Sequence, residues 1–302
     1  MNVIFMGTPE YAQKILEALI AESNINIVGV YTQPDKPVGR KKVLTPPVVK
    51  RVAQESGIRV YQPARLRDEE TIAELLNIEC DYIVVAAYGQ ILPREVLDHA
   101  PCINLHASIL PHYRGASPIQ QTLLNGDTKT GVTAMLMEEG LDTGDILTIK
   151  TLDVAKDTMV EELFEELTLL AKDVTIDVLN NFDSYLPQKQ NEADATHCKK
   201  ITKADGEVKF DNALNLFNKY RAFTPWPGIY LESGLKLKKI VLENEKTNQE
   251  SGKILSIESD SIIVSCYIGA IPVYRVQPTS KKEMDVLAYV NGKRLKIADT
   301  LS

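Results

Sequence analysis

The residues most able to do chemistry in this chain lie between Asn104 and Asp142. An Asn-Leu-His triplet runs from Asn104 to His106, and Asp142 lies in a Gly-Leu-Asp-Thr-Gly turn. Together they supply an amide, an imidazole and a carboxylate without an obvious enzyme nucleophile. Such a set suits direct acyl-type transfer better than covalent catalysis.

Asn104 and His106 belong to an apolar run that predicts a strand over 102–106. Side chains two positions apart on a strand project from the same face, so the amide and the imidazole are expected to be neighbours. His106 also falls where the strand ends, and open α/β sheets bind ligands at the carboxyl ends of their strands. The spacing therefore favours a site at this edge, although a lone imidazole is more often structural.

Asp142 decides whether this pair can catalyse a reaction. If its carboxylate approaches His106, the imidazole becomes a competent proton shuttle, and the Asn104 amide can donate hydrogen bonds to a developing oxyanion. Loss of one such donor typically costs about 3 to 4 kcal/mol of transition-state stabilisation. Outside that arrangement, Asp142 is an ordinary turn-forming residue.

Two other side chains, Ser108 and Cys102, compete as nucleophiles. Neither lies in a Gly-x-Ser-x-Gly elbow or beside a clear base, so we interpret them as a loop residue and a core residue. The loop from Ser108 to Gly115 contains Pro111, which restricts the backbone, and ends at a glycine, which permits close approach. Its free backbone groups suit a flat heterocycle, unless the segment is simply a turn.

Composition restricts the class of protein. The chain has 302 residues, 44% of them hydrophobic and 25% charged, which predicts a soluble protein with two domains. Its four cysteines show no Cys-x-x-Cys spacing, and four histidines offer no plausible zinc set, so we expect no metal and reduced thiols, as in the cytoplasm. The N-terminus reads as a strand and predicts neither a signal peptide nor a membrane span.

The net charge of −7 is unevenly distributed. Residues 199–302 contain 17 Lys and Arg against 12 Asp and Glu, whereas the rest of the chain is strongly acidic. An acidic average argues against indiscriminate nucleic-acid binding, but the basic C-terminal third permits a directed contact with a polyanion. A solvated lysine-rich surface explains the same numbers.

Apolar runs and helical spacing alternate along the first part of the chain. Strands are predicted at 2–6, 25–31, 59–61, 82–87, 102–106, 132–137 and 146–152, and helices at 9–20, 48–56, 68–77, 117–124 and 161–180. This alternation, with near-continuous apolar strands, indicates an α/β fold with a Rossmann-like, mostly parallel sheet. The first strand leads into Gly7-Thr8-Pro9-Glu10 instead of Gly-x-Gly-x-x-Gly, which argues against a dinucleotide-binding module.

A change in composition after Tyr185 predicts the domain organisation. We expect a catalytic domain at 1–185, a polar linker at 186–206 and a C-terminal domain at 207–302. In the last of these, a helix at 213–221 precedes strands at 254–257, 261–266 and 270–277, a pattern typical of a small β-barrel.

The chain resembles the methionyl-tRNA formyltransferases, a branch of the folate-dependent formyltransferase family, over nearly its whole length. The N-terminal motifs that carry the resemblance are Phe5-Met6-Gly7-Thr8-Pro9, Gln33-Pro34-Asp35-Lys36-Pro37 with Gly39-Arg40, Ala87-Tyr88-Gly89-Gln90-Ile91-Leu92-Pro93, Asn104-Leu105-His106, the Ser108–Gly115 loop with Pro118-Ile119-Gln120, and Gly140-Leu141-Asp142-Thr143-Gly144-Asp145. Arg221-Ala222-Phe223 and Pro225-Trp226-Pro227-Gly228 extend it into the C-terminal part. The triplet, the loop and the Asp turn are shared by folate-dependent formyltransferases generally, whereas the segment 33–47 resembles a loop specific to the tRNA enzymes.

The resemblance implies the reaction and the site. The formyl group of 10-formyltetrahydrofolate would pass to the methionine amino group of initiator methionyl-tRNA, by direct attack through a tetrahedral intermediate, for translation initiation. Asn104, His106 and Asp142 match the catalytic trio of the family. The folate-binding positions would be Ser108, Ile109, Leu110 and Pro111 in the loop and Tyr88, Gly89, Gln90, Ile91 and Leu92 in a pterin pocket at 85–92; core packing explains the apolar members equally well.

The resemblance also implies how tRNA is bound. The candidate phosphate contacts in the loop specific to the tRNA enzymes are Lys36, Arg40, Lys41 and Lys42, with a solvated loop as the alternative. The C-terminal domain would be an OB-like β-barrel, a fold that commonly binds nucleic acid. Trp226, the single tryptophan, is interpreted as a packing anchor at the domain junction. We expect a cytoplasmic monomer.

Two alternatives stay open. An enzyme with the same formyl donor could act on a nucleotide-linked amino sugar, but the basic stretch at 33–51 argues against that acceptor. A purely RNA-binding adaptor would leave the polar trio of Asn104, His106 and Asp142 without a reason.

Overall fold

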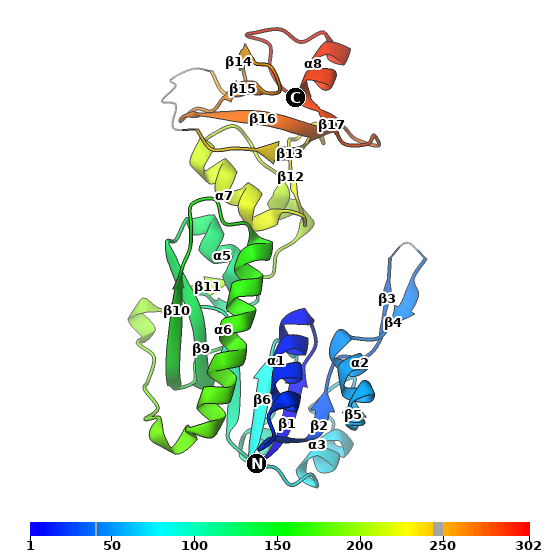
Figure 1. Ribbon diagram of the computed structural model, residues 1–302, viewed down its shortest axis with the longest axis vertical. Helices are drawn as coiled ribbons and strands as arrows, with labels where there is room; N and C mark the ends of the chain where they lie inside the picture. The colour runs from blue at the N-terminus through cyan, green and yellow to red at the C-terminus, as the bar shows by residue number, and fades with distance from the viewer. Residues whose placement is uncertain (40, 244–249) are drawn as a thin grey trace. The chain divides into compact units, whose positions relative to one another are not determined.

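The computed structural model describes residues 1–39, 41–243 and 250–302, and the chain divides into two compact units (Figure 1). Unit 1 comprises Met1–Pro118, Lys129–Asp153 and Leu163–Cys198, and unit 2 comprises Ile119–Thr128, Val154–Glu162 and Lys199–Ser302.

A seven-stranded sheet forms the centre of unit 1, in the order β10-β9-β7-β6-β1-β2-β5. The strands are β1 Asn2–Gly7, β2 Asn26–Tyr31, β5 Val60–Tyr61, β6 Tyr82–Ala86, β7 Cys102–His106, β9 Lys129–Leu136 and β10 Ile146–Asp153. The five strands from β5 to β7 pair in parallel, whereas β9 is antiparallel to both β7 and β10. The mostly parallel sheet predicted from the sequence is confirmed.

Helices cover both faces of this sheet. They are α1 Glu10–Ala21, α2 Val48–Glu55, α3 Glu69–Leu76, α4 Arg94–Leu97 and α6 Val160–Asn180, the last belonging to unit 1 from Leu163 onward. Figure 1 shows α1 and α6 over one face, where the ring of Tyr11 meets that of Phe164 at 6.3 Å. On the other face, Ile4 and Met6 of β1 share a core cluster with Leu75 of α3 and Val96 of α4. Because both faces are covered, β1 is apolar in every central position, as its sequence required.

Two small sheets complete unit 1. A hairpin joins β3 (Lys36–Val38) to β4 (Val43–Thr45), and β8 (Arg114–Gly115) pairs in parallel with β11 (His197–Cys198). Two short 3₁₀ helices follow α6, η1 (Phe182–Ser184) and η2 (Glu192–Asp194). Part of the segment that the sequence predicts as a linker therefore contains ordered elements packed in unit 1. The polar sequence of this segment does not predict these elements, because β11 forms by pairing with β8, some 80 positions away.

An antiparallel sheet forms the centre of unit 2, in the order β12-β13-β16-β15-β14, with β17 paired to β16. Its strands are β12 Ile229–Tyr230, β13 Lys236–Ile240, β14 Ile254–Ile257, β15 Ile262–Ser265, β16 Ala270–Gln277 and β17 Met284–Asp285. Its helices are η3 Lys203–Gly206, α7 Ala213–Phe223, α8 Val286–Lys293 and α5 Pro118–Asn125, of which α5 belongs to unit 2 from Ile119 onward. The strand predictions at 254–257 and 270–277 agree with β14 and β16, whereas α8 was not predicted because its apolar residues lack helical spacing.

Arg221 of α7 ties together the separate segments of unit 2. Its side chain is only 3% exposed, and its guanidinium donates hydrogen bonds at 3.3 Å to the carbonyls of Leu123, Ala155 and Thr158. A buried guanidinium needs such acceptors, so this residue fixes α5 and the segment before α6 against α7.

Across the ranges that the structure describes, no helix is long and apolar enough to span a membrane. Within the same ranges, His, Cys, Asp and Glu side chains form no group of three that would hold a metal ion.

Candidate active site

The site is built on β7, the strand between β6 and β9. All five residues of β7 are buried, and pairing places Asn104 opposite Val85 of β6 and Met135 of β9. Asn104 and His106 are only 8% and 6% exposed, which is rare for polar side chains unless they have partners. Strand pairing on both sides therefore fixes the backbone of these two residues at the carboxyl end of β7.

Asp142 reaches both of them from the turn after β9. Asn104 Nδ2 lies 3.4 Å from Asp142 Oδ1, and His106 Nδ1 lies 3.7 Å from Asp142 Oδ2. The same Oδ2 accepts a hydrogen bond from the backbone N–H of Gly115 at 2.8 Å. The structure thus brings the amide and the imidazole of one strand to a carboxylate that lies 38 positions after Asn104 in the sequence.

The other ring nitrogen of His106 is engaged by the protein backbone. Nε2 lies 2.8 Å from the carbonyl oxygen of Tyr113. Because a carbonyl only accepts, Nε2 carries the hydrogen in this contact, and the Nδ1 edge is the one that faces Asp142. The tautomer and the ring orientation are therefore set by the loop that follows β7.

The loop from Ser108 to Gly115 is braced by its own side chains and by Thr133 of β9. The Ser108 hydroxyl donates to the carbonyl of His112 at 2.6 Å, and the Thr133 hydroxyl donates to the Ser108 carbonyl at 2.7 Å. Thr133 also accepts from the backbone N–H of Leu110 at 3.1 Å. Ser108 is thus committed to shaping the loop, and sequence reasoning missed Thr133 because its partners are more than 20 positions away.

Neither competing nucleophile is placed for catalysis. The hydroxyl of Ser108 points to a backbone carbonyl instead of His106, and burial raises the pKa of the Cys102 thiol to about 12. A thiol with that pKa forms almost no thiolate at neutral pH, and the thiolate is the reactive species. Both residues are structural, as their sequence context indicated.

The predicted pterin segment follows β6, at the same carboxyl edge of the sheet as His106. Tyr88 and Leu92 are buried in the core, and the Gln90 side chain accepts from the N–H of Leu66 at 2.7 Å and donates to the Pro63 carbonyl at 3.0 Å. These three side chains therefore serve the fold. The side chain of Ile91 is 82% exposed, and the left-handed Gly89 would meet only the Gln33 amide, at 3.8 Å, if it had a Cβ. The segment thus offers backbone, Ile91 and open space to a ligand.

The β3–β4 hairpin carries three of the candidate tRNA-contacting residues. Lys36, Lys41 and Lys42 are exposed, and exposed apolar residues lie close to them in the sequence, Val38 (56%), Val43 (59%) and Leu44 (64%). Arg40 lies outside the described residues. The hairpin extends from the body of unit 1 in Figure 1, so its charged and apolar side chains are available to a partner.

The surface of unit 2 differs from expectation at Trp226. Its side chain is 60% exposed, so the interpretation of Trp226 as a packing anchor is wrong.

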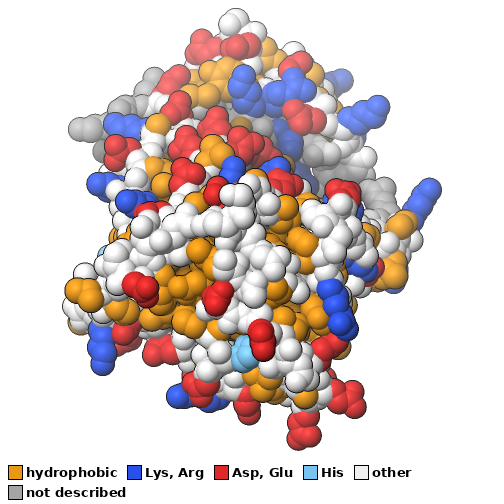
Figure 2. Space-filling view, turned by 60° about the horizontal axis from the view of Figure 1, so that its bottom comes forward, with side chains coloured by type: hydrophobic (Ala, Val, Ile, Leu, Met, Phe, Trp, Pro, Cys, Tyr) orange, Lys and Arg blue, Asp and Glu red, His pale blue; other side chains and the backbone are white. Residues whose placement is uncertain are grey.

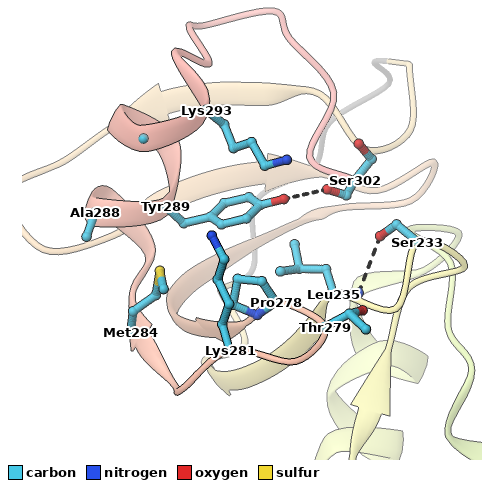
Figure 3. Close-up of a pocket in the computed structure, with 11 residues that line it drawn as sticks. Ser233, Leu235, Pro278, Thr279, Lys281, Met284, Ala288, Tyr289, Lys293 and Ser302 are labelled. Carbon is cyan, nitrogen blue, oxygen red and sulfur yellow. Dashed lines mark hydrogen bonds between the residues drawn. The ribbon is translucent and has the colours of Figure 1, made fainter.

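Unit 2 also contains a cavity of about 460 Å³ beside α8 (Figure 3). Lys281 and Lys293 line it, and the Tyr289 hydroxyl donates to the Ser302 carbonyl at 2.7 Å. Figure 2 shows acidic and basic side chains scattered over one face of the molecule, with hydrophobic side chains between them.

Comparison with known proteins identifies the family. Residues 1–179 match the formyl transferase family and residues 200–294 match the formyl transferase C-terminal domain. A methionyl-tRNA formyltransferase of Sulfurimonas denitrificans is 68% identical over the full length of both chains, and one of Nitratiruptor sp. is 55% identical over 99% of both.

Solved structures agree on the fold. A sugar 3N-formyl transferase structure superposes with a TM-score of 0.69 at 18% identity and covers 93% of this chain and 99% of its own. An N-formyltransferase of Helicobacter canadensis gives 0.68 at 17% identity, with 90% and 98% covered. At these identities the likeness supports the fold, whereas the full-length relatives decide the branch. The chain belongs to the methionyl-tRNA formyltransferase family.

Proposed function

We propose that the protein transfers the formyl group of 10-formyltetrahydrofolate to the methionine amino group of initiator methionyl-tRNA. The observation that carries this function is the placement of Asp142 within 3.4 Å of Asn104 and 3.7 Å of His106 in a chain 68% identical to a methionyl-tRNA formyltransferase. With both competing nucleophiles engaged elsewhere, the attacking group is the amine of the substrate itself. The protein then has to stabilise charge and move protons.

Each member of the trio has a role that its contacts support. Asn104 donates its amide hydrogens to the oxyanion of the tetrahedral intermediate, and His106 turns its Nδ1 edge from the long 3.7 Å contact with Asp142 to the same oxyanion. Asp142 orients His106 through that edge and assists proton transfer to the leaving folate nitrogen. The long 3.4 Å contact between Asn104 and Asp142 leaves the amide free to turn toward the reacting carbonyl.

We propose that the folate co-substrate binds at the carboxyl ends of β6 and β7, between the segment at 85–92 and the loop at 108–111. The open space before Gly89 and the half-exposed Ile109 and Pro111 fit a flat ring held by backbone groups and apolar contacts. Because the side chains of Tyr88, Gln90 and Leu92 are used internally, these residues would contribute main-chain groups. Ser108 and Leu110 would contribute by shaping the loop.

For tRNA, we propose that the β3–β4 hairpin contacts the acceptor end, with Lys36, Lys41 and Lys42 on phosphates and Arg40 assigned from the sequence. Contacts between lysines of a projecting hairpin and phosphates would fix the position of the tRNA. The exposed apolar side chains would pack against unpaired bases. The antiparallel unit 2 would act as an OB-like barrel domain that adds further phosphate contacts, with domain boundaries at 185 and 207. A cytoplasmic monomer is sufficient for this function.

The direct test is a transfer assay with two acceptors. Purified protein is incubated with 10-formyltetrahydrofolate and either charged initiator methionyl-tRNA or charged elongator methionyl-tRNA, and N-formylmethionine is quantified after deacylation. We expect formylation of the initiator alone. Formylation of neither tRNA would refute the proposed function, and equal formylation of both would refute initiator selectivity.

A further inference from the structure

Gln190, a residue in the segment predicted as a linker, holds the turn that carries Asp142. Its amide Nε2 donates to the carbonyl of Asp142 at 2.9 Å and to that of Gly144 at 2.8 Å. These two bonds use both hydrogens of the amide. They attach the main chain on both sides of Thr143 to a residue 48 positions away.

The orientation of this amide is determined by Arg114. The Gln190 Oε1 accepts from Arg114 Nε at 3.0 Å and from Arg114 Nη2 at 2.9 Å. A guanidinium only donates, so the oxygen of Gln190 must face Arg114 and the nitrogen must face the Asp142 turn. The assignment of oxygen and nitrogen follows from the contacts.

Arg114 is itself buried and paired. It is only 1% exposed, and Glu192 binds it in a bidentate pair, with Nη1 at 2.9 Å from Oε2 and Nη2 at 2.7 Å from Oε1. A buried guanidinium without its carboxylate and amide acceptors would be destabilised, so Gln190 and Glu192, whose own side chain is 71% exposed, together fix Arg114. We call Arg114, Gln190 and Glu192 the clamp.

The clamp holds Asp142 in an unfavourable backbone conformation. Asp142 has φ +55, in the left-handed region that costs a non-glycine residue about 1 kcal/mol or more, and such conformations persist only where surrounding contacts impose them. The backbone bond from Gly115 holds the carboxylate of Asp142, and Gln190 holds its main chain. Without Gln190, the turn can relax and carry the carboxylate away from His106.

We propose that Gln190 is a positioning residue for formyl transfer, with Arg114 and Glu192 fixing its orientation. The inference rests on the proposed function because it assigns Gln190 to act through Asp142. Enzymes lose about 10²-fold in rate when a catalytic group is displaced by about 1 Å. We therefore expect Gln190→Met, which keeps the side-chain length but removes the hydrogen bonds to the Asp142 turn and to Arg114, to lower kcat by 10-fold to 100-fold.

The test compares Gln190→Met with Gln188→Met, a matched control. Gln188 pairs with Ile146 through its backbone and its side chain is exposed, so its replacement should leave kcat and KM within about twofold. In Gln190→Met, kcat should fall while KM for both substrates changes by less than about threefold, because the clamp contacts the Asp turn and not the substrates. A kcat within twofold of wild type would overturn the proposal.

A double-mutant cycle shows whether Gln190 acts through Asp142. In an Asp142→Ala background, Gln190→Met should reduce kcat by less than about threefold further, since the group that it positions is gone. Fully multiplicative losses would overturn the positioning role. Normal turnover of Asp142→Ala itself would instead refute the site assignment in the proposed function, a separate result.

A spectroscopic readout does not depend on turnover. The Cε1–H proton resonance of His106, assigned with a His106→Gln variant, should move in Gln190→Met toward its position in Asp142→Ala and stay in place in Gln188→Met. An unmoved resonance in Gln190→Met would overturn the proposal. If Gln190→Met fails to fold, Gln190→Glu replaces it, because it keeps the acceptor for Arg114 and replaces the donors to the turn by a carboxylate oxygen that cannot bond to carbonyls.

Discussion

The carboxylate of Asp142 and the backbone N–H of Gly115 are joined by a 2.8 Å hydrogen bond, and the accepting oxygen is the one that faces His106. A turn after β9 is thereby linked to the loop after β7. The position of this carboxylate depends on the path of the backbone at Gly115, because the turn after β9 and the loop after β7 meet there.

Replacing Gly115 by Ala should disrupt this link. Gly115 has φ +116, and an added Cβ would collide with the carbonyl oxygen of Cys198, so β8 and β11 must separate. We expect a loss of about 1 to 3 kcal/mol in the free energy of unfolding and at least a 10-fold loss of kcat. Urea unfolding and the transfer assay measure both. Gly57→Ala is the control, since φ is +71 there but an added Cβ meets open space. Unchanged activity in Gly115→Ala would contradict the coupling between the two segments.

Removal of the trio should abolish most turnover without unfolding the protein. Asn104→Ala, His106→Ala and Asp142→Asn are each expected to lower kcat by about 10² to 10⁴, the usual range for an oxyanion donor or a general acid–base group. Circular dichroism checks folding. Asp98→Asn is the matched control for the carboxylate, because Asp98 pairs with Arg94 on an exposed surface where ion pairs contribute little. Turnover near that of wild type in any trio variant would remove that residue from the mechanism.

Salt dependence should reveal a phosphate contact at the hairpin. If Lys41 binds a phosphate, Lys41→Gln should weaken tRNA binding and reduce the slope of log affinity against log salt by about 0.7 to 0.9. Filter binding at several salt concentrations measures the slope, and KM for the folate should not change. Lys14→Gln serves as control, since Lys14 lies on α1 and pairs with Glu17. Identical slopes for the two variants would exclude Lys41 as a phosphate contact.

Acid should weaken unit 2 through Asp205. Hydrogen bonds from Thr202, and then the charge of Lys199, lower the pKa of the Asp205 carboxyl to about 2. The unfolded-state pKa of an Asp carboxyl is about 3.9. Because the folded-state pKa is lower, the ionised carboxylate stabilises the folded protein fully above about pH 4, and this stabilisation is lost as the pH falls through about 2. Asp205→Asn should therefore be less stable than wild type by about 1 kcal/mol at neutral pH, the usual net value of one hydrogen bond, since Asp205 accepts from the N-cap residue Thr202 in a capping box.

The pH course of that difference is the decisive measurement. Urea unfolding should show the gap between wild type and Asp205→Asn narrowing between about pH 4 and pH 2. Asp260→Asn, at an exposed turn, controls for the general effect of losing a negative charge. A gap that stays constant over this range would show that the carboxylate of Asp205 is not preferentially stabilised in the folded protein.

Much of unit 1 could be predicted because its signals are local. The strand at 102–106 agrees with β7 at both ends, and the helix predicted at 161–180 differs from α6 by one residue, since apolar periodicity reports burial directly. The hairpin at β3 and β4 and helix α8 were not predicted. Their side chains are mostly exposed or lack a clear period, so composition does not mark them.

The sequence by itself determined the types of the reacting groups, the strand that carries two of them, the absence of a clear enzyme nucleophile and the resemblance to a family. Each of these depends on neighbouring residues or short motifs. Only the tertiary structure decided how Asp142 is held. Its supports, Gly115 and Gln190, are 27 and 48 positions away, and they meet it only after separate loops have folded against one another. A glutamine in a polar stretch has no local feature that distinguishes it from a solvated one, because its role arises from the carbonyls and the guanidinium that folding brings to its two ends.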